Sequence, residues 1–196
     1  MPKQDYFDRS YYQRYYHSKT TRVTDDSEHG RLADFVCSYV KYLEQPVKRV
    51  LDLGCGVGYW RDAVEHAFPK AAYQGVEHSR YLCDTYGWQE GSVVDYRGRG
   101  RYDLVICQDV IQYLPDADVG KAIRNIARLC RGLVFLQITT AGDWRHTCDQ
   151  SLSDENIQRR TGDWYRRRLK RHFKNLGGGL FLPKDSSLMI YELQQL

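Results

Sequence analysis

The chain has 196 residues and a formal net charge of +4 at pH 7. This length suits one compact domain, and the charge falls well short of the dense basic surface that is typical of nucleic-acid binders. The six cysteines are scattered singly with no zinc-ligand spacing, and no apolar run approaches the ~20 residues that cross a bilayer. We therefore expect a cytoplasmic protein without metal or membrane attachment.

The first part of the chain, residues 1–46, is predicted to form a tyrosine-rich helical cap. The stretch DYFDRSYYQRYYHSK (5–19) places aromatic side chains on two neighbouring helical faces: Phe7, Tyr11 and Tyr15 on one, Tyr12 and Tyr16 on the other. Two interpretations stay open. The segment is either an amphipathic helix that packs on the sheet, or a lid over a ligand.

From residue 47 to residue 196 the chain alternates short apolar runs with helical patterns, which is typical of a doubly wound α/β sheet. Apolar runs predict strands over residues 49–53, 72–77, 92–95, 102–107 and 133–139. Helical spacing predicts helices over 60–68 and 118–129. A basic helix around 164–174 leads through three glycines to the runs 179–182 and 188–193, which suggest a closing hairpin.

The segment VLDLGCGVGYW (50–60) carries the strongest chemical signal, because an apolar strand ends at Asp52 and runs through three glycines into a helix. Glycines let a bulky ligand approach the main chain. A dinucleotide fingerprint needs a small residue at its last position, where this chain has Tyr59. The charge of Asp52 suits a cationic amino group and opposes a pyrophosphate. The pattern favours a zwitterionic or cationic ligand, such as S-adenosylmethionine (SAM), and disfavours an NAD-dependent oxidoreductase.

Polar residues follow the next strands at the edge where open α/β sheets bind ligands. Glu77 ends the second strand, and its carboxylate can accept hydrogen bonds from both hydroxyls of a ribose. Asp95 ends the predicted third strand and is a candidate acceptor for an exocyclic amine such as that of adenine. The fourth strand ends at Cys107-Gln108-Asp109, and a helical turn (110–114) follows.

The segments VLDLGCGVG, GVEHS, GSVVD and YDLVICQDVIQYL together resemble the successive motifs of class I SAM-dependent methyltransferases, over roughly residues 47–140. The resemblance implies a Rossmann-like, seven-stranded sheet of order 3-2-1-4-5-7-6, mostly parallel with an antiparallel last strand. It also implies SAM as cofactor, S-adenosylhomocysteine (SAH) as product, and SAM contacts from Asp52, Gly54, Cys55, Gly56, Gly58, Glu77, His78, Val94, Asp95 and Gln108.

The proposed reaction is in-line displacement at the methyl group by an oxygen, nitrogen or carbon atom of a small-molecule acceptor. Predicted acceptor contacts come from the N-terminal segment, the turn after the fourth strand and AGDWRHTCDQ (141–150): Tyr11, Tyr12, Tyr113, Trp144 and His146. If the acceptor must lose a proton, His146 and Tyr113 are the candidate bases, with His17 third.

Other functions remain open at this point. The loop CQDVIQYLPD lacks the DPPY tetrad of DNA amino-methyltransferases and the paired glutamates of arginine methyltransferases. We therefore expect no DNA partner, and we interpret residues 159–174 as a solvated surface helix. The alternatives are a non-catalytic SAM-binding regulatory or partner protein, and a methyltransferase acting on a protein or RNA. We expect a monomer or a homodimer.

Overall fold

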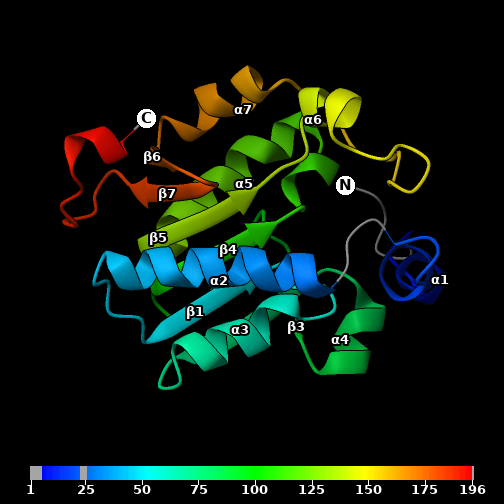
Figure 1. Ribbon diagram of the computed structural model, residues 1–196, viewed down its shortest axis with the longest axis horizontal. Coiled ribbons are helices and arrows are strands. Elements are labelled where there is room, and N and C mark those ends of the chain that lie inside the picture. The colour runs from blue at the N-terminus through cyan, green and yellow to red at the C-terminus, as the bar shows by residue number, and fades with distance from the viewer. Residues whose placement is uncertain (1–5, 23–25, 196) are drawn as a thin grey trace.

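The computed structural model describes residues 6–22 and 26–195, and the other residues of the predicted cap, 1–5 and 23–25, lie outside this description. A seven-stranded sheet of order β3-β2-β1-β4-β5-β7-β6 forms its centre (Figure 1). β7 runs antiparallel to both of its neighbours, and the other pairs are parallel. The predicted fold class is confirmed. The strands are Arg49–Leu53 (β1), Ala72–Glu77 (β2), Gln89–Glu90 (β3), Tyr102–Gln108 (β4), Cys130–Gln137 (β5), Phe173–Gly177 (β6) and Leu180–Pro183 (β7).

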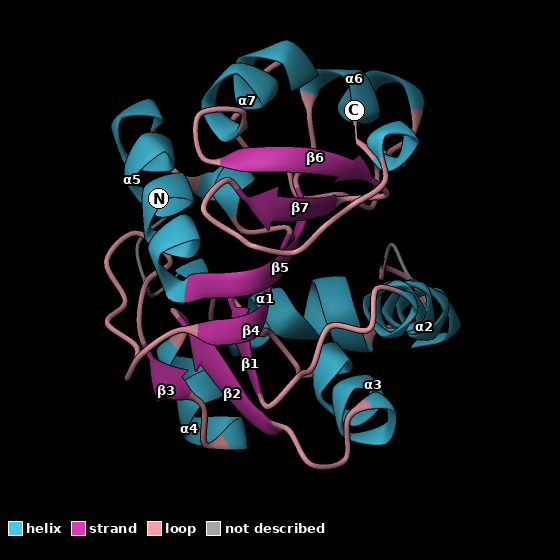
Figure 2. Cartoon of the chain, turned by 90° about the vertical axis from the view of Figure 1, so that its left-hand side faces the viewer, coloured by secondary structure: helices cyan, strands magenta, loops and turns pink. Residues whose placement is uncertain are grey.

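Helices cover both faces of the sheet, with α2 and α3 on one side and α5 on the other (Figure 2). None of the described helices is long and apolar enough to span a membrane. The α-helices are Arg9–Tyr12 (α1), Asp26–Tyr42 (α2), Tyr59–Ala67 (α3), Arg80–Tyr86 (α4), Asp116–Leu129 (α5), Ala141–His146 (α6) and Gly162–Leu169 (α7). A π-helix, Gln13–His17 (η2), and two 3₁₀ turns, Ile111–Tyr113 (η3) and Glu192–Gln194 (η4), complete the elements.

The alternation of side chains along the central strands creates two cores. In β4, Val105 points into the core beneath α5, whereas Leu104 and Ile106 point into the core beneath α2 and α3. Because both faces are covered, the strand must be apolar throughout, and residues 102–107 are all buried. This two-sided burial explains why the sequence predicted β1 and β4 accurately.

The predicted strand over residues 92–95 is wrong, since β3 consists of Gln89 and Glu90 and the chain then turns. The backbone amides of Asp95 and Tyr96 donate to the carbonyl of Ser92, which closes the turn. The side chain of Asn125 donates to the carbonyls of Val93 and Tyr96. These local and side-chain bonds take the place of a strand ladder, so the apolar pattern of Val93 and Val94 reflects burial under α5.

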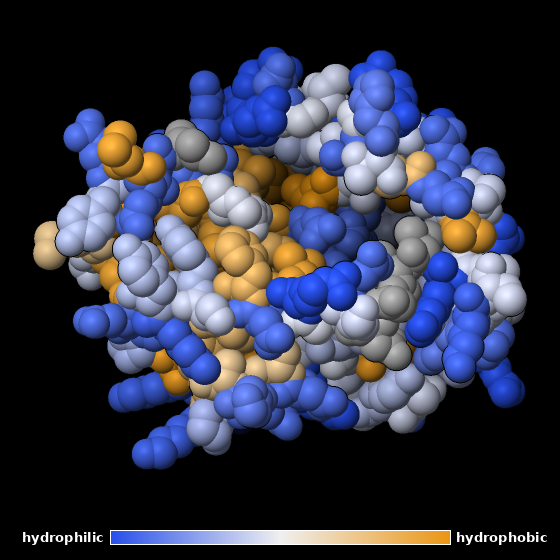
Figure 3. All heavy atoms as spheres, in the orientation of Figure 1, coloured by the Kyte–Doolittle hydropathy of each residue, from blue (hydrophilic) through white to orange (hydrophobic). Residues whose placement is uncertain are grey.

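The predicted closing hairpin is half correct. Its strand over 179–182 is β7, but the partner is β6, which occupies the end of the predicted basic helix. Gly177, Gly178 and Gly179 all have positive φ; Gly177 ends β6, and Gly178 and Gly179 form the tight turn of this hairpin. The run 188–193 pairs with no described strand: Leu188 and Ile190 pack on the core beneath α2. Phe35 of α2 and Met189 of this run are exposed. Figure 3 shows that hydrophobic residues gather on the left-hand part of the face in view.

The hairpin turn supplies a test of this fold. At Gly179, φ is +78°, and an added Cβ would lie 2.8 Å from the Phe135 ring and 3.0 Å from the Leu136 carbonyl oxygen. We expect Gly179→Ala to lower the free energy of unfolding by about 1–3 kcal/mol, because the left-handed conformation and the contact both cost energy. Urea unfolding measures the change. The control, Gly120→Ala in α5, meets no described atom within 4 Å, and should be neutral or stabilising. Equal changes in the free energy of unfolding for the two variants would contradict the left-handed conformation of Gly179 in this turn.

Candidate active site

The turn after β1 is closed on one side and open on the other. The amides of Gly54 and Cys55 both donate to the Val76 carbonyl, at 2.7 and 3.2 Å, which ties the turn to β2. A Cβ on Gly54 would lie 2.2 Å from Cγ2 of Val110, so this position has no room for a side chain. A Cβ on Gly56 would meet none of the described atoms within 4 Å. The open side at Gly56 is therefore where a ligand can approach the main chain.

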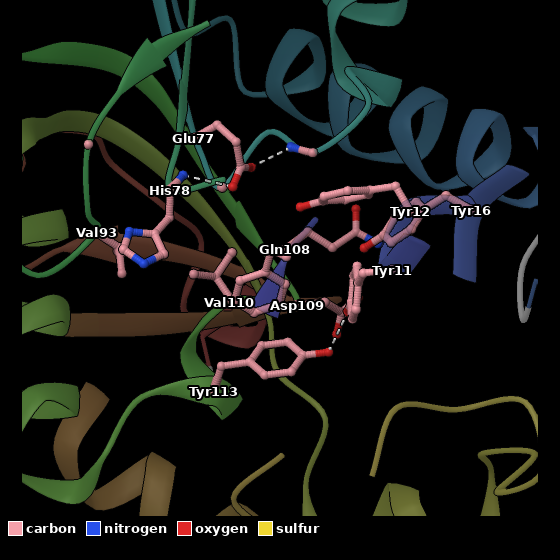
Figure 4. A pocket seen from close by; sticks show the side chains of 14 residues that line it. Tyr11, Tyr12, Tyr16, Glu77, His78, Val93, Gln108, Asp109, Val110 and Tyr113 are labelled. Atoms are coloured by element: carbon pink, nitrogen blue, oxygen red, sulfur yellow. Dashed lines mark hydrogen bonds between the residues drawn. The ribbon is translucent and has the colours of Figure 1, made fainter. Parts of the chain in front are cut away.

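Glu77, at the end of β2, joins two backbone segments around this opening. Its Oε2 accepts from the Gly56 amide at 2.8 Å, and its Oε1 accepts from the amides of His78 and Ser79 at 2.7 and 2.9 Å. The carboxylate is 6% exposed. Each carboxylate oxygen has two lone-pair sites, so Oε2 keeps the capacity to accept from a ligand. Figure 4 shows Glu77 and His78 on the side of the cavity opposite Tyr12 and Tyr16.

Trp88 packs against the glycine turn and forms a hydrogen bond with it. Its indole Nε1 donates to the Gly56 carbonyl at 2.9 Å. Added Cβ atoms on Gly58 and Gly75 would lie 2.9 and 2.6 Å from its ring, so both glycines give the indole room. The ring thus holds the glycine turn at a fixed position relative to β2.

Two adjoining cavities lie at the carboxyl edge of the sheet. The inner cavity, about 60 Å³, is lined by the glycine turn, Glu77, the end of β4 and the N-terminal tyrosines, including Gly54, Gly56, His78, Val93, Gln108 and Tyr12. The outer cavity, about 440 Å³, extends toward α2, α6 and residues 147–157, and its lining includes Gln112, Trp144 and Asp154. Four residues line both cavities: Tyr11, Tyr16, Asp109 and Tyr113.

Asp109 lies at the boundary between these cavities. Its φ is +54°, an uncommon conformation for a residue with a side chain, and its amide donates to the Gln137 carbonyl of β5 at 2.9 Å. Its Oδ1 accepts from Gln112 Nε2 at 3.1 Å and from Thr139 Oγ1 at 3.2 Å. Burial raises the pKa of this carboxyl, while the hydrogen bonds oppose the rise. A strained, partly buried carboxyl group with a raised pKa is a candidate for proton transfer.

The N-terminal segment closes over both cavities. Tyr11 and Tyr12 are buried, and the Tyr11 and Tyr113 hydroxyls are 3.1 Å apart (Figure 4). Its first described residues are fastened to distant parts of the chain. The Tyr6 hydroxyl donates to Asp154 Oδ1 at 2.8 Å, and the Ser79 hydroxyl donates to the Phe7 carbonyl at 2.5 Å. The segment crosses the ligand edge, as a lid would.

Comparison with known proteins identifies the family. Residues 24–177 match the family model described as a methyltransferase domain. The chain belongs to this methyltransferase family. A ubiquinone biosynthesis O-methyltransferase of Bordetella parapertussis is 32% identical over 102 residues, which cover 45% of this chain and 42% of that protein. The match with this chain thus spans less than half the length of that curated relative.

Solved structures share the fold of this methyltransferase. The PH0226 protein from Pyrococcus horikoshii has a TM-score of 0.65 at 16% identity, covering 90% of this chain and 99% of that one. The plantazolicin methyltransferase BpumL, solved in complex with SAH, has a TM-score of 0.60 at 11% identity and covers 86% of this chain and 72% of its own. Family and fold together make the chain a class I SAM-dependent methyltransferase.

The structure of the methyltransferase brings together part of the predicted set of SAM contacts. Five residues line the inner cavity: Gly54, Gly56, Glu77, His78 and Gln108. Five others do not line it: Asp52, Cys55, Gly58, Val94 and Asp95. Asp95 is exposed, because β3 ends before the residues that were expected to continue it. Gln108 Oε1 accepts from Trp60 Nε1 at 2.8 Å, which orients its amide.

Of the residues predicted to contact the acceptor, some line a cavity and others do not. Tyr11, Tyr113 and Trp144 line the outer cavity, and Tyr12 lines the inner one. His146 lines neither cavity and is exposed on α6, and His17 is exposed as well. A base must lie within hydrogen-bond reach of the acceptor, so the position of both histidines argues against that role. Burial raises the pKa of Tyr113 well above 10, so its hydroxyl stays protonated at neutral pH.

Sequence reasoning left several lining residues out of the predicted set: Tyr16, Val93, Asp109, Gln112 and Asp154. The signal for Asp109 was present, because it follows Gln108 at the end of a buried strand. Asp154 had no such signal, since residues 147–161 form no regular element. Only the fold brings this segment over the cavity.

Asp52 lies behind the turn, buried at 1% exposure, where it accepts a 2.6 Å hydrogen bond from the Tyr73 hydroxyl. Burial raises its pKa from 3.8 to about 7, and the Tyr73 hydrogen bond offsets only part of this shift. At pH values below about 4 the group is neutral in both the folded and the unfolded state. Between about pH 4 and pH 7, folding must therefore oppose the ionisation that the unfolded chain permits.

We therefore expect the stability of the methyltransferase without SAM to fall relative to that of an Asp52→Asn variant as pH rises from about 4 to about 8. The raised pKa of Asp52 corresponds to a change in the free energy of unfolding on the order of 4 kcal/mol. The side-chain oxygen of the asparagine can still accept the hydrogen bond from Tyr73. Chemical unfolding across this range measures the difference. Asp62→Asn on α3, whose side chain is 93% exposed, is the matched control and should show no such trend. If the difference in unfolding free energy between the wild-type protein and Asp52→Asn does not change with pH, the pKa of Asp52 is not raised by burial.

Proposed function

We propose that the protein transfers the methyl group of SAM to a small-molecule acceptor, with the donor in the inner cavity and the acceptor in the outer one. The observation that carries this proposal is the wall that the two cavities share. Tyr11, Tyr16, Asp109 and Tyr113 line both, so ligands in the two cavities would face each other at these residues. In-line displacement requires such a juxtaposition of donor and acceptor.

The residues of the inner cavity fit SAM. The open side of Gly56 gives the ligand room beside the backbone, and Oε2 of Glu77 can accept from the ribose hydroxyls. Val93 and Val110 provide apolar surface for the adenine ring. When bound, SAM supplies a sulfonium methyl that is already activated for displacement. The protein's remaining tasks are alignment, exclusion of water and transfer of a proton.

Asp109 is the residue that we propose for proton transfer. It contacts both cavities, and its raised pKa brings the carboxyl closer to the neutral range in which a base must exchange protons. Gln112 and Thr139 both donate to Oδ1, so we expect Oδ2 to be the oxygen that takes the proton of an acceptor hydroxyl or amine. The protonated hydroxyl of Tyr113 can donate a hydrogen bond to the acceptor.

The N-terminal segment acts as a lid in this proposal. Pockets for nucleoside-sized ligands enclose roughly 300 Å³ or more, whereas the inner cavity is about 60 Å³ with the tyrosines in place. The segment must therefore shift for SAM to enter. Once closed, its aromatic rings exclude water from the sulfonium and offer it π-faces.

SAH should bind to the wild-type protein, and Glu77→Gln should weaken binding by about 1–2 kcal/mol. The amide group lacks the charge, and it cannot accept hydrogen bonds at both of its ends. Titration calorimetry with SAH measures this change. Glu65→Gln, an exposed change of the same type on α3, should leave the affinity as it is. If Glu77→Gln folds and binds SAH like wild type, Glu77 does not hold the ribose.

The latch of the lid gives a kinetic test. Tyr6→Phe removes the hydroxyl that donates to Asp154 and accepts from Asn156. Losing these two bonds, each worth about 1 kcal/mol, should raise the SAH dissociation rate at least roughly fivefold by favouring the open lid. Stopped-flow fluorescence measures the rate. Tyr191→Phe, at a residue that is 79% exposed, is the control. Equal dissociation rates for all three proteins would contradict a latched lid.

Methyl transfer itself separates an enzyme from a SAM-binding partner protein. We expect radiolabel from methyl-labelled SAM to enter small molecules of a cell extract, and Asp109→Asn to lower that transfer at least tenfold while SAH affinity is maintained. Label that enters only protein or RNA would assign the alternative acceptors.

A further inference from the structure

The outer cavity is acidic and aromatic. Its lining contains three carboxylates, from Glu28, Asp109 and Asp154, and His29 is the single lining side chain within the described residues that can carry a positive charge. Five aromatic side chains form much of its wall: Tyr11, Tyr15, Tyr16, Tyr113 and Trp144. Negative charge combined with aromatic faces is the environment in which proteins bind organic cations.

Asp154 has one oxygen in use and one without a partner. Oδ1 accepts from the Tyr6 hydroxyl at 2.8 Å, from the Asn156 amide at 2.9 Å and from Asn156 Nδ2 at 3.1 Å. Oδ2 is buried and accepts no hydrogen bond from the described residues, and the residue as a whole is 8% exposed. A buried carboxylate oxygen without a donor is costly, so it calls for a ligand that supplies one.

Gln112, on η3, likewise has one side-chain polar atom with a partner and one without. Its Nε2 donates to Asp109 Oδ1 at 3.1 Å, and an ionised carboxylate can only accept, which fixes the orientation of the amide. Its Oε1 is buried without a donor among the described residues, and the side chain is 3% exposed. The two unpartnered atoms in the lining of this cavity are thus both acceptors.

SAM does not account for these acceptors. Asp154 and Gln112 line the outer cavity and not the inner one, where the proposed function puts the sulfonium. The ligand that complements them must have several N–H donors, a positive charge and an apolar body that packs between aromatic rings. A protonated amine on a small organic molecule has these properties.

We propose that the methyl acceptor carries a protonated amine, which Asp154 and Gln112 bind in the outer cavity. This proposal rests on the proposed function, since it names the class of acceptor for the same site. It makes Asp154 a specificity-determining residue: its charge selects cations over neutral and anionic molecules of the same shape.

Three probes of similar shape and different charge test the proposal: tyramine (cation), para-ethylphenol (neutral) and para-hydroxyphenylacetate (anion). Their binding to the SAH-loaded protein is measured by calorimetry at pH 7. We expect tyramine to bind at least tenfold more tightly than para-ethylphenol, and para-hydroxyphenylacetate to bind more weakly still.

Asp154→Asn keeps Oδ1 for Tyr6 and Asn156 but replaces Oδ2 with an NH₂ donor, so tyramine should lose its advantage of tenfold or more. Glu155→Gln removes the same charge at the neighbouring exposed residue and should preserve that advantage. The melting temperature and SAH affinity of each variant report whether it is folded.

The proposal is overturned if tyramine binds no more tightly than para-ethylphenol, if none of the probes binds, or if folded Asp154→Asn keeps the preference. Failure of the wild-type protein to bind SAH would instead remove the proposed function, and this proposal with it. The SAH titration alone distinguishes that case from a failure of amine recognition.

Discussion

The site depends on the three backbone amides that converge on the Glu77 carboxylate. Gly56 belongs to the turn after β1, and His78 and Ser79 belong to the turn after β2. A single buried side chain therefore fixes the distance between the two turns that border the inner cavity. Charge-assisted hydrogen bonds are stronger than neutral ones, and burial strengthens them further. The glycine turn keeps its open shape because this carboxylate holds it on one side and Trp88 on the other.

The same edge of the sheet also accommodates a strained residue and the segment that we propose as a lid. Asp109 adopts a positive φ directly after β4, and the N-terminal segment, which contains α1 and the π-helix η2, lines the cavities beside it with tyrosine side chains. Hydroxyl contacts from Tyr6 and Tyr11 close this segment over the cavities. Such bonds individually contribute about 1 kcal/mol, so they can open and close without unfolding the core. Catalysis that must admit a ligand and then exclude water requires this combination.

The central sheet could be predicted from the sequence because burial on both faces leaves a continuous apolar run, as in β4. The same reasoning failed at Val93 and Val94, since these valines are apolar for packing under α5 while their backbone turns. The hairpin was misassigned because Gly177–Gly179 were interpreted as a connection to it, whereas Gly178 and Gly179 form its turn. The glycine turn and Glu77 were recognisable, for their chemistry is local. Asp154 was not, because its role arises from a contact with Tyr6 across the fold.

A crystal structure of the protein with SAH tests the central claim most directly. We expect the ribose hydroxyls on Glu77, the sulfur atom at the boundary formed by Asp109 and Tyr113, and the tyrosines of the N-terminal segment in contact with the ligand. SAH bound away from Glu77, or with its sulfur atom turned from the outer cavity, would contradict the division of the site into a donor cavity and an acceptor cavity.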